Sequence, residues 1–122
     1  MTRINVGIDP IELIDKHLLA EHREIKRIPN TILSGRAIIK DIPKKFTLGK
    51  GHVKFFYNKI GYLFLRYVDI RNECWRRGFN ITNYSKSFWK IRETRSELWN
   101  FYDETKADRE LVLERIKSKI IA

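Results

Sequence analysis

The sequence predicts an all-α fold: a single compact domain of three principal helices with an extended N-terminal arm. Apolar residues recur three or four positions apart in the segments 9–27, 52–77 and 103–120. Glycine and proline separate these segments, and neither an internal repeat nor a low-complexity stretch occurs. A chain of 122 residues, 43% of them hydrophobic, can bury one modest core, so we expect one domain spanning residues 1–122.

The chain is strongly basic, with a formal net charge of +10. Such a field attracts polyanions, and nucleic acid is the commonest of these partners. The excess of Lys and Arg over Asp and Glu is +4 in residues 1–50 and +6 in residues 51–90, but zero in residues 91–122. We therefore expect the DNA-facing surface on the first two thirds of the chain.

Several classes of protein are disfavoured by composition. The richest apolar stretch, residues 62–70, contains Arg66 and Asp69, so no membrane span is expected. The N-terminus lacks the apolar core of a secretory signal, which predicts a cytoplasmic protein. Cys74 is the only cysteine, and this excludes an internal disulfide and a cysteine-based zinc site.

The first segment predicts an arm followed by a helix. Residues 2–8 lack helical periodicity, whereas Asp9 can cap a helix that Pro10 begins and Glu12 completes as a capping box. We expect this helix to run to Arg27. Its buried stripe is predicted to hold Ile11, Ile14, Leu18 and Ile25.

A polar row lies beside that apolar stripe. His17, Glu21 and Glu24 are four and three residues apart, so they share one face of the predicted helix. Carboxylates at the edge of a buried face are partly desolvated, which is typical of functional groups. A network that orients helix packing is the favoured interpretation on spacing alone, and the functional interpretation stays open.

The middle of the chain predicts one short and one long helical segment. Pro29 should end or kink the first helix, and residues 31–38 should form a second piece. A long helix is predicted from His52 to Arg77, with a bend near Gly61 and a cap at Gly78. Its core side is predicted to hold Phe56, Leu63, Tyr67, Ile70 and Cys74, and four cations are expected to be exposed and available to phosphates: Arg66, Arg71, Arg76 and Arg77.

The C-terminal third mixes aromatic and basic residues. Residues 88–102 include Trp89, Leu98 and Trp99, which can cover the core or stack on unpaired bases, and core packing is favoured. Residues 103–120 predict a last amphipathic helix. Leu111, Ile116 and Ile120 are its expected buried residues.

Several blocks of the sequence, in order, resemble a known family. They are residues 1–5 (MTRIN), 17–27 (HLLAEHREIKR), 46–57 (FTLGKGHVKFFY) and 73–81 (ECWRRGFNI). Together they resemble the phage pyrimidine-dimer DNA glycosylases with AP lyase activity, of the endonuclease V type. The resemblance implies an all-α fold whose arm passes between helices to reach the active site.

The resemblance also implies a chemistry and a substrate. After removal of Met1, the α-amine of Thr2 would attack the deoxyribose, expel the base and form an imine, and β-elimination would then cut the strand. Glu24 carries over as the acidic partner. A chain-terminal amine, with a reference pKa of about 7.7–8.0, suits this role better than lysine. The expected partner is double-stranded DNA with a damaged base or an abasic site, the protein should act as a monomer, and no metal or organic cofactor is implied.

The resemblance assigns DNA contacts to residues around the pair. Arg3, Arg23 and Arg27 match positions that contact the backbone, and His17 matches an active-site position. Two further candidates are Lys16, where the family has glutamine, and Arg115, where the family has a lysine on its last helix. Each has a structural alternative: Arg27 can offset a helix dipole, and His17 can simply bond Glu21.

Departures from the family pattern leave the lesion open. The family usually has tyrosine at His22 and often proline at Lys26, so these positions are candidates for a changed substrate. The family's C-terminal aromatic segment, Trp-Tyr-Lys-Tyr-Tyr-Gly, is missing from the end of this sequence. The alternatives are therefore a glycosylase for another lesion or modified base, or a DNA-binding protein that has lost catalysis because Met1 is retained.

Overall fold

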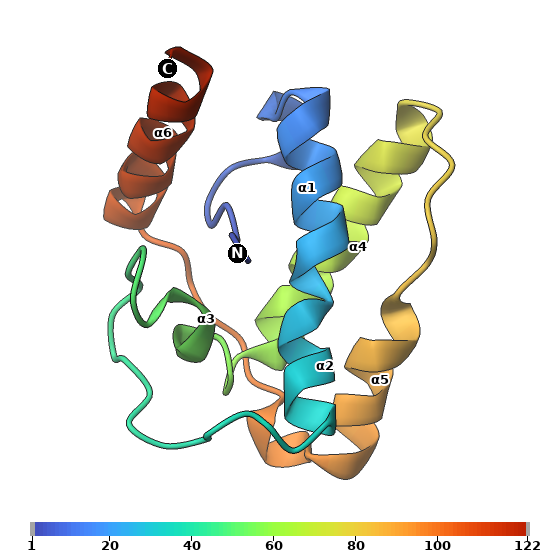
Figure 1. The fold of residues 1–122 in the computed structure, drawn as a ribbon, viewed down its shortest axis with the longest axis vertical. Helices are drawn as coiled ribbons and strands as arrows, with labels where there is room; N and C mark the ends of the chain where they lie inside the picture. The colour runs from blue at the N-terminus through green and yellow to red at the C-terminus, as the bar shows by residue number, and fades with distance from the viewer. Residues whose placement is uncertain (1, 122) are drawn as a thin grey trace.

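The computed structural model describes residues 2–121, without the side chain of the last of these, and confirms the all-α prediction. No strand occurs in these residues. Three longer helices, α1, α4 and α6, are joined by shorter ones, and the arm lies between α1 and α6 (Figure 1). The helices are α1 (Asp15–Ile25), α2 (Arg27–Leu33), α3 (His52–Phe55), α4 (Ile60–Arg76), α5 (Ser85–Thr94) and α6 (Lys106–Ile121), with 3-10 turns η1 (Pro10–Glu12) and η2 (Ser96–Leu98).

The prediction of one helix from Asp9 to Arg27 is wrong at its start. Asp9 does cap a helical turn, with both halves of the capping box formed, but that turn is the 3-10 segment η1. Extended backbone at residues 13–14 separates it from α1. The helical stripe is therefore broken: Ile11 is 62% exposed, whereas Leu18 is fully buried.

The first helix ends close to Pro29, as predicted, but Pro29 itself lies within α2. It is the third residue of α2 and has no N–H to donate to the carbonyl of Ile25, where α1 ends. The prediction for residues 31–38 is correct only as far as Leu33. Ser34 closes α2, and Gly35 follows in a left-handed conformation at φ +80°.

The predicted long helix is two helices, because residues 56–59 form a turn between α3 and α4. Gly61 does not bend α4; because it has no side chain, a distant segment of the chain can pack against the helix there. A Cβ there would lie 3.0 Å from the carbonyl oxygen of Asn100, which accepts a hydrogen bond from the Tyr62 N–H. Gly78 caps α4 as predicted, at φ +84°, and the Phe79 N–H donates to the Cys74 carbonyl.

Fewer apolar side chains of the C-terminal third are buried than the spacing of its apolar residues predicts. Leu111 and Ile120 are exposed and Ile116 is only partly buried, while Val112 is fully buried. The reason is that α6 faces the arm (Figure 1), which it contacts largely through arginines. Leu98 packs in the core as predicted, but Trp89 stays 40% exposed and stacks on Trp99.

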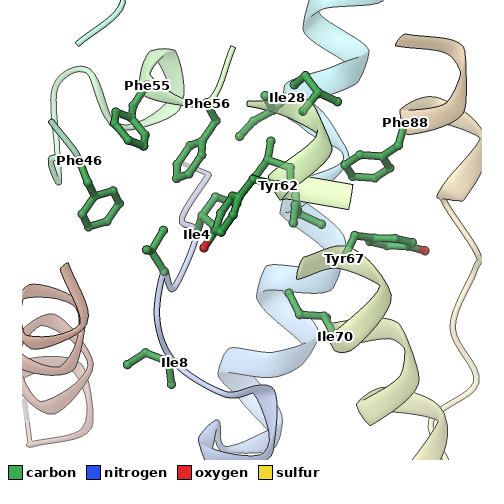
Figure 2. Close-up of a cluster of buried hydrophobic side chains, with 14 of the residues drawn as sticks. Ile4, Ile8, Ile28, Phe46, Phe55, Phe56, Tyr62, Tyr67, Ile70 and Phe88 are labelled. Atoms are coloured by element: carbon green, nitrogen blue, oxygen red, sulfur yellow. The ribbon is translucent and has the colours of Figure 1, made fainter. Parts of the chain in front are cut away.

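The core includes the arm itself. Ile4, Val6 and Ile8 are buried and belong to the hydrophobic cluster, in which Figure 2 shows Ile4 and Ile8 on the arm. The predicted core residues of the long segment are all fully buried: Phe56, Leu63, Tyr67, Ile70 and Cys74. Arm and helices therefore share one hydrophobic core.

One predicted phosphate contact is instead a buried ion pair. Arg66 is buried and gives both its Nε and its Nη2 to the carboxylate of Glu21, which is 1% exposed. Its Nη1 donates to the Ile8 carbonyl at 2.9 Å. Burial lowers the pKa of Arg66, but the charge and hydrogen bonds of Glu21 outweigh it and raise the pKa overall. Arg66 thus joins α1, α4 and the arm.

Replacing Arg66 with leucine should be strongly destabilising. The substitution leaves the Glu21 charge buried without its partner, which typically costs about 3–5 kcal/mol. Urea unfolding at neutral pH measures the difference. Arg76→Leu is the matched control, since Arg76 is exposed and Glu73 keeps Arg77 as a second partner. Equal effects of the two substitutions would contradict the central role of Arg66.

Candidate active site

The arm is held by side chains from several helices. The backbone groups bonded at Ile4 N–H and Ile8 C=O are buried and therefore need a protein partner, whereas the bond at the Gly7 N–H is exposed. Three side chains accept from N–H groups of the arm: Glu24 from Arg3, His52 from Ile4 and Glu104 from Gly7. Three arginines donate to its carbonyls: Arg66 to Ile8, Arg109 to Gly7 and Arg115 to Ile4.

Glu24 is the carboxylate nearest the start of the arm. Its Oε1 accepts from the Arg3 N–H at 3.1 Å, and its Oε2 lies 3.8 Å from a guanidinium nitrogen of Arg23. The Glu24 side chain is 15% exposed, so it lies at the edge of the core. Because Thr2 immediately precedes Arg3, its backbone nitrogen lies within one residue, about 3.8 Å of chain, of this anchored position.

A small pocket of about 60 Å³ opens beside Glu24. It is formed where the arm passes between α1 and α6 (Figure 1). Its lining comprises Arg3, Asn5, His17, Ala20, Glu21, Glu24, Arg115, Ile116 and Lys119. Sites for small molecules usually measure about 300–1,000 Å³, so this pocket is too small to enclose a whole nucleoside.

The pocket is cationic, with Arg3, Arg115 and Lys119 against Glu21 and Glu24. Burial, then the neighbouring charges of Lys16, Arg115 and Arg3, lower the pKa of His17, so its imidazole is neutral at physiological pH. Burial and Arg3 also lower the pKa of Arg115, which nonetheless stays charged. Nδ1 of His17 is buried without a hydrogen-bond partner. The alternative pairing of His17 with Glu21 is not formed, because Asn5 and Arg66 bind the Glu21 oxygens.

The structure brings some predicted site residues together and leaves others outside the pocket. Arg3, His17, Glu24 and Arg115 line it, and Thr2 directly precedes Arg3 in the chain. Three predicted DNA contacts lie on exposed surface instead: Lys16, Arg23 and Arg27. The polar row of α1 therefore divides, with Glu21 in a packing network and Glu24 at an accessible edge.

Sequence reasoning missed Asn5, His52 and Lys119. The Asn5 amide joins two charged groups: it donates to Glu21 at 2.6 Å and accepts from Arg115 at 2.9 Å. Lys119 follows Arg115 by four residues, and this helical spacing is a signal that could have placed both on one face. No local pattern signals Asn5 or His52, since their partners are distant in the chain.

The two departures thought to alter the substrate are packing residues. His22 is buried between the rings of Tyr67 and Tyr84, with centroids 5.6 and 5.2 Å away. The ammonium of Lys26 lies 3.9 Å from the ring centroid of Tyr84. Neither residue lines the pocket, so the expectation that they mark a changed substrate has no support in their position.

A second, larger groove of about 780 Å³ lies between the arm, α4 and residues 102–104. Carboxylates dominate its lining: Asp9, Asp69, Glu73, Asp103 and Glu104. A phosphate backbone would be repelled there, so the small cationic pocket is the better candidate for DNA chemistry. Within residues 2–121, no cluster of histidine, cysteine and acidic side chains is arranged to bind a metal ion, and no helix could span a bilayer.

The expected removal of Met1 concerns a residue that lies outside the described residues. A protein-family model described as pyrimidine dimer DNA glycosylase matches residues 1–87, which include the arm, α1 and most of the pocket. Since this match covers well over half of the sequence, the chain belongs to the pyrimidine dimer DNA glycosylase family.

Proposed function

We propose that this protein is a DNA glycosylase with AP lyase activity, whose nucleophile is the α-amine of Thr2 after removal of Met1. The observation that carries the proposal is the anchoring of the Arg3 N–H on Glu24, in a cationic pocket of a chain that belongs to this family. A pyrimidine dimer is the first candidate lesion. The expected substrate is double-stranded DNA, bound by a single copy of the chain.

The proposed reaction needs only groups that the pocket offers. The neutral amine forms a bond to C1′ of the deoxyribose while the bond from C1′ to the base breaks and the base leaves with the electron pair. Ring opening then gives an imine. Loss of a proton from C2′ expels the 3′-phosphate by β-elimination, and water releases the enzyme from the imine.

Glu24 is proposed as the acid–base and electrostatic partner in these steps. A carboxylate next to the anchored arm can stabilise positive charge that develops on the sugar and can carry protons during imine formation and elimination. The pocket of about 60 Å³ is too small to enclose a whole nucleoside, and we place the sugar at its mouth beside Glu24. The base or the lesion would remain on the open side.

Cations around the pocket are proposed to hold the DNA backbone. Arg3, Arg115 and Lys119 line it, and the exposed Lys16, Arg23 and Arg27 extend this surface along α1 and α2. Each phosphate contact adds to affinity in a salt-dependent way. The neutral His17 would act instead as a hydrogen-bonding group within the pocket.

An imine intermediate can be trapped. We expect sodium borohydride to give a covalent protein–DNA adduct with a duplex that contains a pyrimidine dimer or an abasic site, provided that intact mass shows Met1 removed. Protein acetylated at its N-terminus is the control and should give none. A panel of dimer, abasic, oxidised and modified-base duplexes identifies the substrate. Failure to trap any of them would indicate a DNA-binding protein without this catalysis.

Glu24→Gln should lower single-turnover strand cleavage by at least about 100-fold, in the range expected for loss of an acid–base group. DNA affinity, measured by fluorescence anisotropy, should fall little because the substitution removes no cation. Glu110→Gln, on the exposed surface of α6, is the matched control and should cleave normally. Cleavage at the original rate by the Glu24 variant would remove this residue from the mechanism.

Lys119→Ala and Lys117→Ala form a matched pair on α6. Lys119 lines the pocket, whereas Lys117 lies two residues away and does not. We expect Lys119→Ala to weaken binding to an abasic duplex and to reduce the slope of log K against log salt by about 1. Lys117→Ala should change both less. The reverse order would place the DNA on the other face of the helix.

A further inference from the structure

We propose that His52 is a positioning residue for the Thr2 amine, and that only its neutral imidazole holds the arm in place. His52 touches neither the pocket nor the reacting atoms in the proposed function, on which this inference rests. It acts on the backbone of the arm, two residues from the amine. Its control of the reaction would therefore pass through the position of that backbone.

The hydrogen bonds of His52 determine its tautomer. Nε2 lies 2.9 Å from the backbone nitrogen of Ile4, and Nδ1 lies 2.9 Å from the carbonyl oxygen of Thr47. A backbone N–H can only donate, so Nε2 must be the unprotonated acceptor. Nδ1 therefore carries the single ring proton and donates it to Thr47. The bonding pattern is complete only in the neutral ring.

The surroundings of His52 also favour the neutral form. The ring is buried beside Phe46 and Phe56, with centroids 5.5 and 5.3 Å away. Arg115 on α6 and Glu21 on α1 are the charged groups that act on it, and they oppose each other. Burial lowers the pKa of His52 most, and Thr47 and Glu21 reverse only part of this.

Protonation would break the tether to the arm. Nε2–H would then face the Ile4 N–H, leaving two donors together and a buried amide without an acceptor, an arrangement that costs about 1–3 kcal/mol. The other side chains that bond the arm backbone are arginines and carboxylates, which do not titrate between pH 5 and 8 at their ordinary pKa values. Among the described side chains that bond the arm backbone, His52 is thus the one tether sensitive to that range.

The direction of the pH effect follows from the lowered pKa. Because the folded state binds this proton less readily than the unfolded state, the contribution of neutral His52 is present above about pH 6.5. It is lost as the pH falls through the lower pKa of the folded state. Arg3 N–H would still be bound to Glu24, so the arm should loosen near Ile4 rather than leave the core.

Two variants of His52 separate positioning from packing. His52→Leu removes the acceptor and keeps an apolar side chain, whereas His52→Gln supplies an oxygen acceptor that does not titrate. At pH 7.5 we expect the leucine variant to form the borohydride-trapped adduct about 10- to 100-fold more slowly, with DNA affinity unchanged. The glutamine variant should recover most of the rate. An unaltered rate in a folded leucine variant would overturn the proposal.

The pH profile distinguishes the tether from the amine. If only the amine is protonated, the reaction rate falls with the first power of the proton concentration. Protonation of His52 adds a second dependence of the rate on proton concentration below about pH 6.5. We expect the second dependence in the original protein and in His17→Gln, and its absence in His52→Gln. A steep acid limb that persists in His52→Gln, or disappears in His17→Gln, would contradict the assignment to His52.

A measurement without DNA keeps this inference separate from the proposed function. In NMR spectra of the free protein, the Ile4 amide shift should titrate with the His52 ring nitrogens, and the ring should show the Nδ1–H tautomer above pH 7. In His52→Gln the Ile4 amide should not follow this titration. An Ile4 amide that is indifferent to His52 would overturn the inference even if catalysis is found. Absence of any trapped adduct beside a coupled titration would overturn the proposed function alone.

Discussion

A chain segment buried without secondary structure must have its backbone polar groups satisfied by other parts of the molecule, and this constraint organises the whole protein. The arm lies in the core through Ile4, Val6 and Ile8, so the backbone groups buried with these residues need partners within the protein. Helices α1, α3, α4 and α6 each supply a side chain to it. The helices are consequently held together through the arm as well as through their apolar faces, and the start of the arm acquires a defined position.

Periodicity predicted the parts of the fold in which a helix buries one face along its length. Leu18, Leu63 and Tyr67 are examples, and all are fully buried. It failed where the chain turns because of contacts with distant segments. The turn at residues 56–59 and the role of Gly61 depend on the segment that contains Asn100, some forty residues away. A local pattern carries no information about such a contact.

The candidate site was likewise predictable only where residues close together in the sequence form it. The spacing of His17 and Glu24 placed them on one helix face, and the sequence blocks of the family pointed to the arm beside them. Asn5 and His52 could not be found in this way, because each acquires its role from partners that only folding brings near. The error for Arg66 has the same origin, since its position beside Glu21 depends on how α1 crosses α4.

Two carboxylates one turn apart on α1 differ in what they can bind, because their side chains are exposed to different extents. Glu21 is 1% exposed, and its oxygens are occupied by Arg66 and Asn5, so it has no free capacity for a substrate. Glu24 is 15% exposed and holds one backbone N–H of the arm. The carboxylate of Glu21 is paired with protein groups, whereas the carboxylate of Glu24 borders an open pocket. The same residue type therefore fixes the scaffold at one position and is available for chemistry at the next turn.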